Sequence, residues 1–278
     1  MEDFFLADWN MNIYRGCDHG CIYCDTRSAC YRVEDVAHPH PKADALRILE
    51  DELRGKKRSG VVTMGSMSDP YNPLEKELEL TRGALKLLLR YGFGAAFTTK
   101  SALCARDADL LREIGRYAPV CARLTVTCAD DGLCRRIEPN VSPTAQRLAA
   151  LRTLADAGVY AGVWVNPVLP FITDTEENLV ETLRLSAEAG AQFAVCFMGM
   201  TLRTGNREYY FSALEREFPG VRQKYLTAFG NAYECPSPDA ERLWNIYTAE
   251  CDRLGLAYRF RDVNERMLAR LPAQTSMF

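Results

Sequence analysis

Apolar residues along the chain follow two alternating patterns, one typical of strands and one typical of helices. Short β-branched or small apolar runs predict strands at 60–64, 95–99, 121–127, 160–165 and 192–197. Segments with leucines at helical spacing lie between them, at 44–54, 81–91, 107–117, 142–158 and 175–189. With Ile13 and Tyr14 as a first strand, the alternation predicts an α/β fold around a parallel sheet. Whether the sheet stays open or curls into a partial barrel is not decided by the pattern.

The helix predicted at 142–158 carries clear signals at both ends. Ser142 is expected as its N-cap and Pro143 as its first residue, because proline lacks the N–H that the first turn leaves unpaired. Gly158 is expected just past its last turn, where glycine adopts a left-handed conformation without strain.

The alternation stops after about residue 198. Segments 206–218 and 238–254 are expected as helices, and 257–260 as a strand. No linker rich in proline, glycine or serine separates this part from the rest. We therefore expect a core over residues 1–198 and a helical C-terminal extension over 199–278 that packs on it.

Composition and charge narrow the class of protein. The chain has 278 residues, of which 47% are hydrophobic and 26% charged, as in ordinary globular proteins. No apolar run approaches the roughly 20 residues that span a bilayer, and the N-terminus lacks the features of a signal peptide. These observations predict a cytoplasmic protein. A net charge of −3 does not indicate a broad nucleic-acid-binding surface.

Eleven cysteines are many for a cytoplasmic chain, because a reducing compartment disfavours disulfides. Cys121 and Cys196 lie in apolar runs, where cysteine usually acts as a small buried hydrophobic residue. Cys30, Cys128 and Cys235 fall near expected loops, so a second cluster built from them stays open.

Three cysteines, Cys17, Cys21 and Cys24, lie within eight residues and can turn toward one centre. Thiolates bind zinc or iron–sulfur clusters. A structural zinc site normally needs four ligands, and apart from His19 inside the loop no nearby residue pair supplies a fourth. Three thiolates suit a four-iron cluster with one open iron, and Gly16 and Gly20 would let the loop fold tightly around it.

The pattern Cys17-x3-Cys21-x-Tyr23-Cys24 resembles the signature of the radical S-adenosylmethionine (radical SAM) superfamily. The resemblance implies that the cysteines hold a [4Fe–4S] cluster and that S-adenosylmethionine (SAM) chelates the fourth iron. It also implies reductive cleavage of SAM to methionine and a 5′-deoxyadenosyl radical, which abstracts hydrogen from a substrate. Tyr23 would lie against the adenine. The implied fold is a partial (β/α)6 TIM-type barrel.

Five further segments, 65–75, 97–101, 123–127, 136–139 and 166–170, resemble the spore photoproduct lyase-like branch of that superfamily. By this resemblance, Ser68 and Asp69 contact the amino group of SAM, Lys100 contacts its carboxylate, and Thr125 faces the ribose. The chemistry is consistent, because an ammonium needs an acceptor and a carboxylate needs a cation.

Two residues depart from spore photoproduct lyase. Ser66 stands where the lyase has its hydrogen-donating cysteine, and Asp25 stands where it has a tyrosine after the third cluster cysteine. The O–H bond of serine is too strong for easy hydrogen donation, so these changes argue against thymine-dimer repair. Cys128, Cys196 and Tyr160 are alternative radical relays, and the sequence singles out none of them.

Three functions therefore remain open. The leading hypothesis is a radical SAM enzyme with an unidentified substrate and an electron donor such as flavodoxin or ferredoxin. The second is a nucleic-acid lesion lyase, and the third is a non-catalytic zinc-binding protein. Substrate contacts are expected in the C-terminal extension, where the candidates are Arg203, Arg207, Tyr209 and Tyr210.

Overall fold

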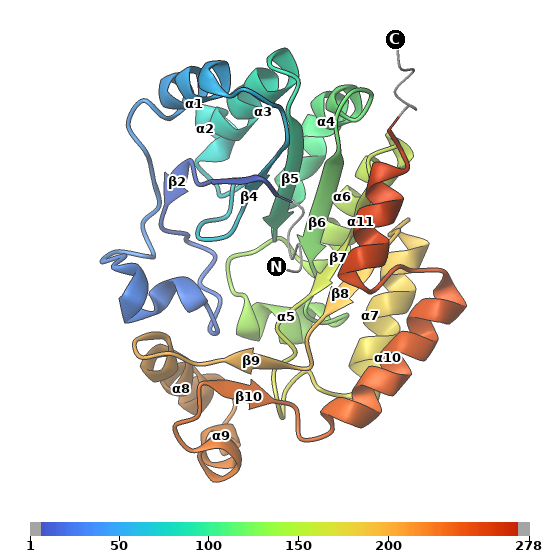
Figure 1. Ribbon diagram of the computed structural model, residues 1–278. Helices are drawn as coiled ribbons and strands as arrows, with labels where there is room; N and C mark the ends of the chain where they lie inside the picture. Colours follow the sequence, from blue (N-terminus) through green and yellow to red (C-terminus); the bar gives the residue numbers. More distant parts are fainter. Residues whose placement is uncertain (1–6, 272–278) are drawn as a thin grey trace.

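A computed structural model describes residues 7–271 and contains one six-stranded parallel sheet (Figure 1). The strands lie in chain order: β1 (Trp9–Met11), β4 (Val61–Met64), β5 (Gly94–Thr99), β6 (Val120–Thr125), β7 (Ala161–Val165) and β8 (Ala194–Cys196). Every neighbouring pair is parallel. Because β1 and β8 do not pair, the barrel is open, and the predicted partial TIM-type barrel is confirmed.

Helices connect the strands and cover the outer face of the sheet (Figure 1). They are α1 (Ala45–Gly55), α3 (Leu80–Arg90), α4 (Ala108–Ile114), α6 (Thr144–Asp156) and α7 (Glu176–Glu188). Two short helices, α2 (Glu75–Leu78) and α5 (Asp131–Ile137), lie in the loops after β4 and β6. Short 3-10 turns span Asp25–Arg27, Ala29–Tyr31 and Ala102–Asp107.

The two faces of the sheet belong to different apolar clusters, as the two-residue period of a strand requires. On β5, Ala95 and Phe97 belong to the large core beneath the helices, whereas Ala96 belongs to a second cluster. That second cluster includes Val263 and Met267 of α11 (Phe260–Leu268). The C-terminal helix therefore packs against the inner side of the sheet.

The first barrel strand is not the one predicted. Tyr14–Arg15 form β2, which pairs antiparallel with β3 (His40–Pro41), so Ile13 and Tyr14 are not a barrel strand. The first barrel strand is β1, which pairs with β4. Its signal is the alternation of Trp9 and Met11 with the more exposed Asn10, which is typical of an edge strand with one covered face.

The start of α6 also differs from the prediction. The helix begins at Thr144 with Pro143 in the capping position. The Ser142 hydroxyl instead accepts the Ala102 N–H at 2.9 Å, so its side chain ties down a neighbouring loop. Gly158 follows the helix with φ of 83°, as predicted.

The C-terminal part adds a hairpin and four helices. The hairpin pairs β9 (Gly199–Thr201) with β10 (Glu234–Pro236), and its connection contains α8 (Asn206–Glu217) and α9 (Val221–Phe229). Next, α10 (Ala240–Leu254) packs against α7. The strand predicted at 257–260 is wrong, because Ala257 makes only an isolated bridge to Phe193 and Phe260 begins α11.

A further apolar cluster joins this C-terminal part to the cysteine loop. It brings Ile22 of the loop and Ile137 of α5 together with Tyr210, Leu214 and Tyr225. These residues of the extension therefore contact the cysteine loop and α5, while the division into a core and an extension at residue 198 stays a prediction.

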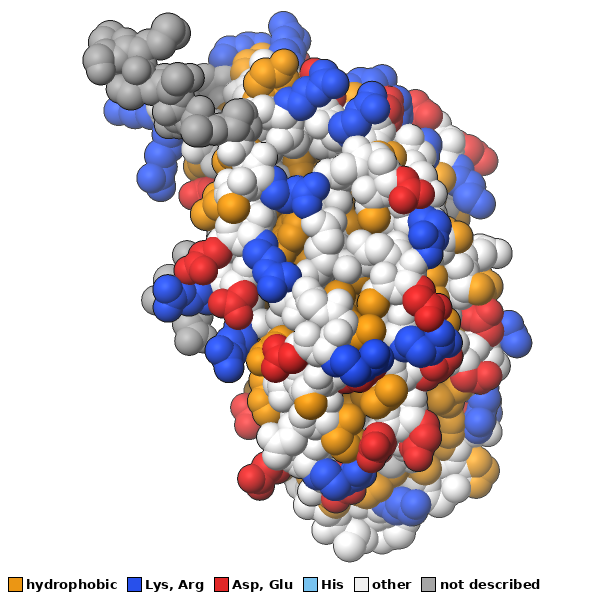
Figure 2. Space-filling model, turned by 90° about the vertical axis from the view of Figure 1, so that its right-hand side faces the viewer, with side chains coloured by type: hydrophobic (Ala, Val, Ile, Leu, Met, Phe, Trp, Pro, Cys, Tyr) orange, Lys and Arg blue, Asp and Glu red, His pale blue; other side chains and the backbone are white. Residues whose placement is uncertain are grey.

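The molecular surface over α7, α10 and α11 mixes both signs of charge, with Lys and Arg side chains interspersed among Asp and Glu (Figure 2). Within residues 7–271, no helix is long and apolar enough to cross a membrane.

Candidate cofactor pocket

A cavity of about 190 Å³ brings together every residue predicted to bind a metal or cofactor. The loop after β2 contributes three cysteines and Tyr23, and the segments at the ends of β4, β5 and β6 supply the rest. The predicted residues that line it are Cys17, Cys21, Tyr23, Cys24, Ser68, Asp69, Lys100 and Thr125. The cavity lies at the carboxyl ends of the parallel strands, where such folds bind ligands.

Glycines and backbone hydrogen bonds shape the cysteine loop. Gly16 and Gly20 have φ of 81° and 67°, so both adopt the left-handed conformation that glycine tolerates. The Cys17 N–H donates to the Val36 carbonyl at 2.7 Å, and Asn140 Nδ2 donates to the Asp18 carbonyl at 2.7 Å. These contacts fix both sides of the loop.

The loop thiols are unlike free surface cysteines. Burial, reinforced by the nearby Asp69 charge, raises the pKa of Cys17 to about 12. Burial also raises the pKa of Cys21 well above its ordinary value, although Lys100 opposes the shift. Thiols in such surroundings stay protonated at neutral pH unless a metal ion stabilises the thiolates. The pocket therefore suits cysteines that serve as metal ligands.

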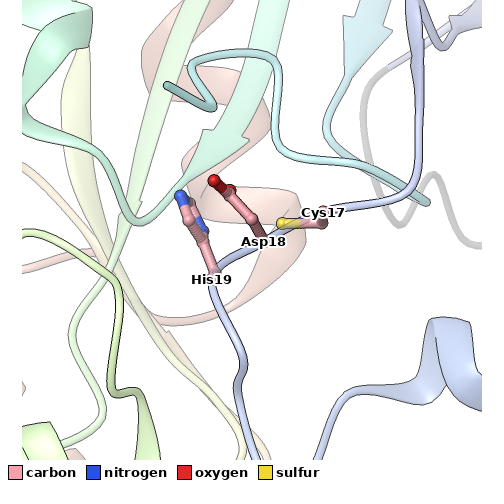
Figure 3. A group of neighbouring side chains, drawn as sticks. All are labelled: Cys17, Asp18 and His19. Carbon is pink, nitrogen blue, oxygen red and sulfur yellow. The ribbon is translucent and has the colours of Figure 1, made fainter. Parts of the chain in front are cut away.

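A second set of possible ligands overlaps this loop. Potential ligand atoms of Cys17, Asp18 and His19 lie within 4.8 Å of one another (Figure 3). His19 Nδ1 also lies 3.4 Å from Asp69 Oδ2. A set of one thiol, one carboxylate and one imidazole suits a single ion, whereas three thiols suit an iron–sulfur cluster.

Asp69 is held rigidly by groups of the protein. Its Oδ1 accepts the Tyr71 N–H at 2.8 Å and the Thr99 hydroxyl at 2.6 Å, and its Oδ2 accepts the Lys100 N–H at 2.8 Å. The neighbouring Ser68 hydroxyl donates to the Gly16 carbonyl. Both side chains are therefore fixed acceptors at the wall of the pocket.

Lys100 and Thr125 are two pocket residues whose side-chain polar groups have no hydrogen-bond partner within the described part of the chain. Among the described residues, no carboxylate oxygen lies within 4.0 Å of the Lys100 ammonium, so Lys100 forms no ion pair there. The ammonium lies 5.5 Å from the centroid of the Tyr23 ring. Burial alone would lower the pKa of Lys100, but Cys21, Glu138 and Asp69 raise it above its ordinary value. The Thr125 hydroxyl is buried without a hydrogen-bond partner. Such groups fit a polar ligand with a negative charge.

Comparison with protein families identifies the superfamily of the chain that forms this pocket. The profile of the Radical SAM superfamily matches residues 11–216. The chain belongs to the radical SAM superfamily. It is therefore an enzyme that uses radical chemistry of SAM, as predicted, and membership implies an iron–sulfur cluster and a reductant.

Relatives of this radical SAM enzyme include proteins without an assigned function. An uncharacterised protein of Mycobacterium tuberculosis is 29% identical, covering 97% of this chain and 82% of its own length. An uncharacterised protein of Methanocaldococcus jannaschii is 30% identical, covering 63% of this chain and 66% of its own. A tRNA-2-methylthio-N(6)-dimethylallyladenosine synthase of Thermus thermophilus is 27% identical, covering 75% of this chain and 44% of its own.

Solved structures confirm the likeness in fold. Spore photoproduct lyase with bound SAM and dinucleoside spore photoproduct aligns with a TM-score of 0.66 at 15% identity. The alignment covers 90% of this chain and 75% of the lyase. Streptococcus suis SuiB bound to its precursor peptide aligns with a TM-score of 0.53 at 15% identity, covering 81% of this chain and 47% of its own.

Two residues that contact the lining of this radical SAM pocket were given no role by the sequence reasoning. Glu138 and Arg147 form an ion pair at 2.9 Å, and both side chains are completely buried. Glu138 accepts a hydrogen bond from the Tyr23 hydroxyl. Arg147 donates to the Thr125 carbonyl at 2.6 Å and to Cys134 Sγ at 2.7 Å. The pair thus supports Tyr23 and Thr125. The sequence signal that could have indicated it is Arg147, an arginine among the leucines of α6.

The environment keeps this pair charged. Burial would raise the pKa of Glu138, but Arg147 and Lys100, with the Tyr23 hydroxyl, hold it below its ordinary value. Burial opposes the charge of Arg147, and Glu138 and Cys134 outweigh it, so the pKa of the arginine is raised.

The four candidate substrate contacts of the extension lie in different surroundings. Arg203 forms an ion pair with Asp25 at 2.9 Å and donates to the Tyr31 hydroxyl at 2.5 Å. Arg207 donates to the Leu202 carbonyl at 2.9 Å. Tyr210 is buried in the core of the extension, while Tyr209 lies beneath the Arg27 guanidinium.

None of the proposed alternative relays lines the pocket. Cys128, Cys196 and Tyr160 are all buried and absent from its walls. For the possible second cluster, Cys30 is exposed, whereas Cys128 and Cys235 are buried.

Proposed function

We propose that the pocket binds a [4Fe–4S] cluster on Cys17, Cys21 and Cys24 with SAM beside it. The observation that carries the proposal is the gathering of these thiols with Lys100 and Thr125, whose polar groups have no satisfying protein partner, in one pocket. When bound, the cluster and SAM supply reductive cleavage of the sulfonium, which gives methionine and a 5′-deoxyadenosyl radical that takes hydrogen from the substrate.

The chain's own residues divide the recognition of SAM among them. The Lys100 ammonium offers charge-assisted hydrogen bonds to the carboxylate, and Ser68 and Asp69 offer acceptors to the ammonium. The Thr125 hydroxyl faces the ribose and Tyr23 the adenine. Since Glu138 holds the Tyr23 hydroxyl, the ring has a fixed orientation before the ligand arrives.

The zinc-binding alternative has its own ligand set in Cys17, Asp18 and His19. It is less favourable, because three adjacent residues would have to close around one ion while Cys21 and Cys24 stayed unused. Metal analysis separates the two: one zinc per chain without sulfide would support the alternative.

A DNA-lesion lyase is not favoured by the residues in the lyase positions. The Ser66 hydroxyl donates to Asn10 Oδ1 at 2.9 Å, and Asp25 accepts from Arg203 and Tyr31. Neither residue offers a weak X–H bond to a substrate radical. Absence of binding to UV-irradiated DNA at low salt would reject the lyase activity.

The test is anaerobic reconstitution with iron and sulfide, followed by reduction with dithionite in the presence of SAM. We expect about four irons per chain and release of 5′-deoxyadenosine. Cys17→Ala should lose both, whereas Cys30→Ala, at an exposed cysteine outside the pocket, should retain both. In the cell a flavodoxin or ferredoxin would replace dithionite. A fully loaded protein that never forms 5′-deoxyadenosine would refute the proposal.

A further inference from the structure

A second, larger cavity adjoins the proposed cofactor pocket. It measures about 600 Å³, and Gly20 and Arg27 line both cavities. Most of its walls come from the cysteine loop, from α5 with the residues after it, and from α8 of the extension, and Arg27 and Ala37 complete them. A ligand in this groove would therefore touch both the barrel and the C-terminal extension, beside the site where the radical would form.

The groove carries an excess of positive charge. Its lining includes four arginines, Arg27, Arg135, Arg136 and Arg216, but only two carboxylates, Asp18 and Glu217. Glu217 already pairs with Arg216 at 2.8 Å. Within the described part of the chain, no carboxylate lies within ion-pair distance of the other three arginines. Unpaired arginines in a concave site favour an anionic ligand.

Aromatic rings fix the planes of two of these guanidinium groups. Arg27 lies 3.9 Å from the Tyr209 ring centroid, and Arg136 lies 4.1 Å from that of Phe218. Stacking uses the flat faces and leaves the edges of the guanidinium groups for hydrogen bonds. One Nη of Arg136 donates to the Glu217 carbonyl, and its other edge N–H groups remain for a ligand. Arg27 lines both cavities, and its Nε is buried without a hydrogen-bond partner.

Resting on the proposed function, we propose that this groove binds a phosphate group of the substrate, which is a small phosphate ester. A phosphate presents two negative charges and several oxygens, which match paired N–H donors from more than one arginine. A small ester fits better than a polynucleotide. The whole chain carries a net charge of −3, whereas polynucleotide binding calls for an extended basic surface.

The test is calorimetric titration of the anaerobically reconstituted protein with inorganic phosphate at low salt. We expect one phosphate to bind per chain. Arg135→Ala combined with Arg136→Ala should weaken its binding at least about tenfold, because two charge-assisted donors are lost. Both arginines are exposed, and circular dichroism checks that the double variant is folded. The matched control is Arg112→Ala, an exposed arginine of α4 outside both cavities, which should bind phosphate as the wild type does.

Besides the absence of phosphate binding, two results would overturn the proposal. One is equal phosphate affinity in the wild type and the double variant. The other is tighter binding of a single-stranded oligonucleotide than of phosphate, which would assign the groove to a polynucleotide. Formation of 5′-deoxyadenosine by the same wild-type preparation is measured separately. If 5′-deoxyadenosine forms but phosphate does not bind, the groove proposal fails while the proposed function stands.

Discussion

Two ion pairs flank the cysteine loop. They have the same N–O distance but differ in burial and in the residues they contact. Glu138–Arg147 and Asp25–Arg203 both have N–O distances of 2.9 Å. The first pair is completely buried, whereas the side chains of the second are 40% and 35% exposed. Glu138 holds Tyr23, and Asp25 directly follows Cys24.

The difference shows which contact sets the shape of the pocket. A buried charge that loses its partner keeps its desolvation cost, so the energy of the first pair depends on both members. An exposed pair is hydrated and screened, and either member can lose its partner at little cost. We infer that Glu138–Arg147 fixes the Tyr23 side of the pocket, while Asp25–Arg203 only docks the extension onto the loop.

The largest effect should come from Arg147→Met. This substitution keeps much of the side-chain volume but leaves Glu138 buried without its partner, and it removes the donors to Thr125 and Cys134. We expect the free energy of unfolding to fall by about 3–5 kcal/mol, measured by urea denaturation. A fall no larger than that of an exposed-arginine variant such as Arg112→Ala would contradict the buried-pair account.

A smaller effect is expected when both members of the buried pair are replaced. Combining Glu138→Gln with Arg147→Met removes both charges, so neither is left uncompensated, and the amide can still accept from the Tyr23 hydroxyl. The double variant should be more stable than Arg147→Met alone. Additive losses in a double-mutant cycle would show that the two charges do not depend on each other.

The pH dependence of stability should follow the carboxylate of the same pair. Because the pKa of Glu138 is lower in the folded protein than its ordinary value, the unfolded chain binds its proton first as the pH falls. The resulting stability is complete above about pH 4.3, the ordinary value for a glutamate, and is lost as the pH falls through the lowered pKa. Urea midpoints should fall more steeply in this range for the wild type than for Glu138→Gln. Parallel curves would argue against the ion pair.

The smallest effect should come from Arg203→Met, the matched change in the exposed pair. Tyr31 still donates to Asp25 at 3.0 Å, so the carboxylate keeps a partner. We expect a urea midpoint close to that of the wild type and an unchanged iron content after reconstitution. A loss as large as that of Arg147→Met would remove the distinction between the two pairs.

The sequence predicts local features of the pocket well and long-range ones poorly. Asp69 and Lys100 belong to short segments that follow the barrel strands β4 and β5, so the topology brings them to one end of the barrel. The cysteine loop follows β2, which is not a barrel strand, but its three cysteines lie within eight residues and form a local motif. The pairing of Glu138 with Arg147 depends on how α5 and α6 pack, which no short motif encodes. Ser142 has the composition of a helix cap, but its side chain serves a contact forty residues away.

The edge of the sheet was missed for a similar reason. Strand β1 is only three residues long and half exposed, so its apolar pattern is weaker than that of Ile13 and Tyr14. Those two residues are buried next to the cysteine loop. Parallel pairing with β4 selects the strand, and pairing partners cannot be read from a three-residue pattern.

The central claim is that one pocket holds both the iron–sulfur cluster and SAM. Electron paramagnetic resonance of the reconstituted, dithionite-reduced protein, recorded with and without SAM, tests it most directly. Binding of SAM to the open iron should change the spectrum of the reduced cluster, and Cys30→Ala should behave as the wild type does. A reduced four-iron spectrum that stays identical when saturating SAM is added would contradict the account.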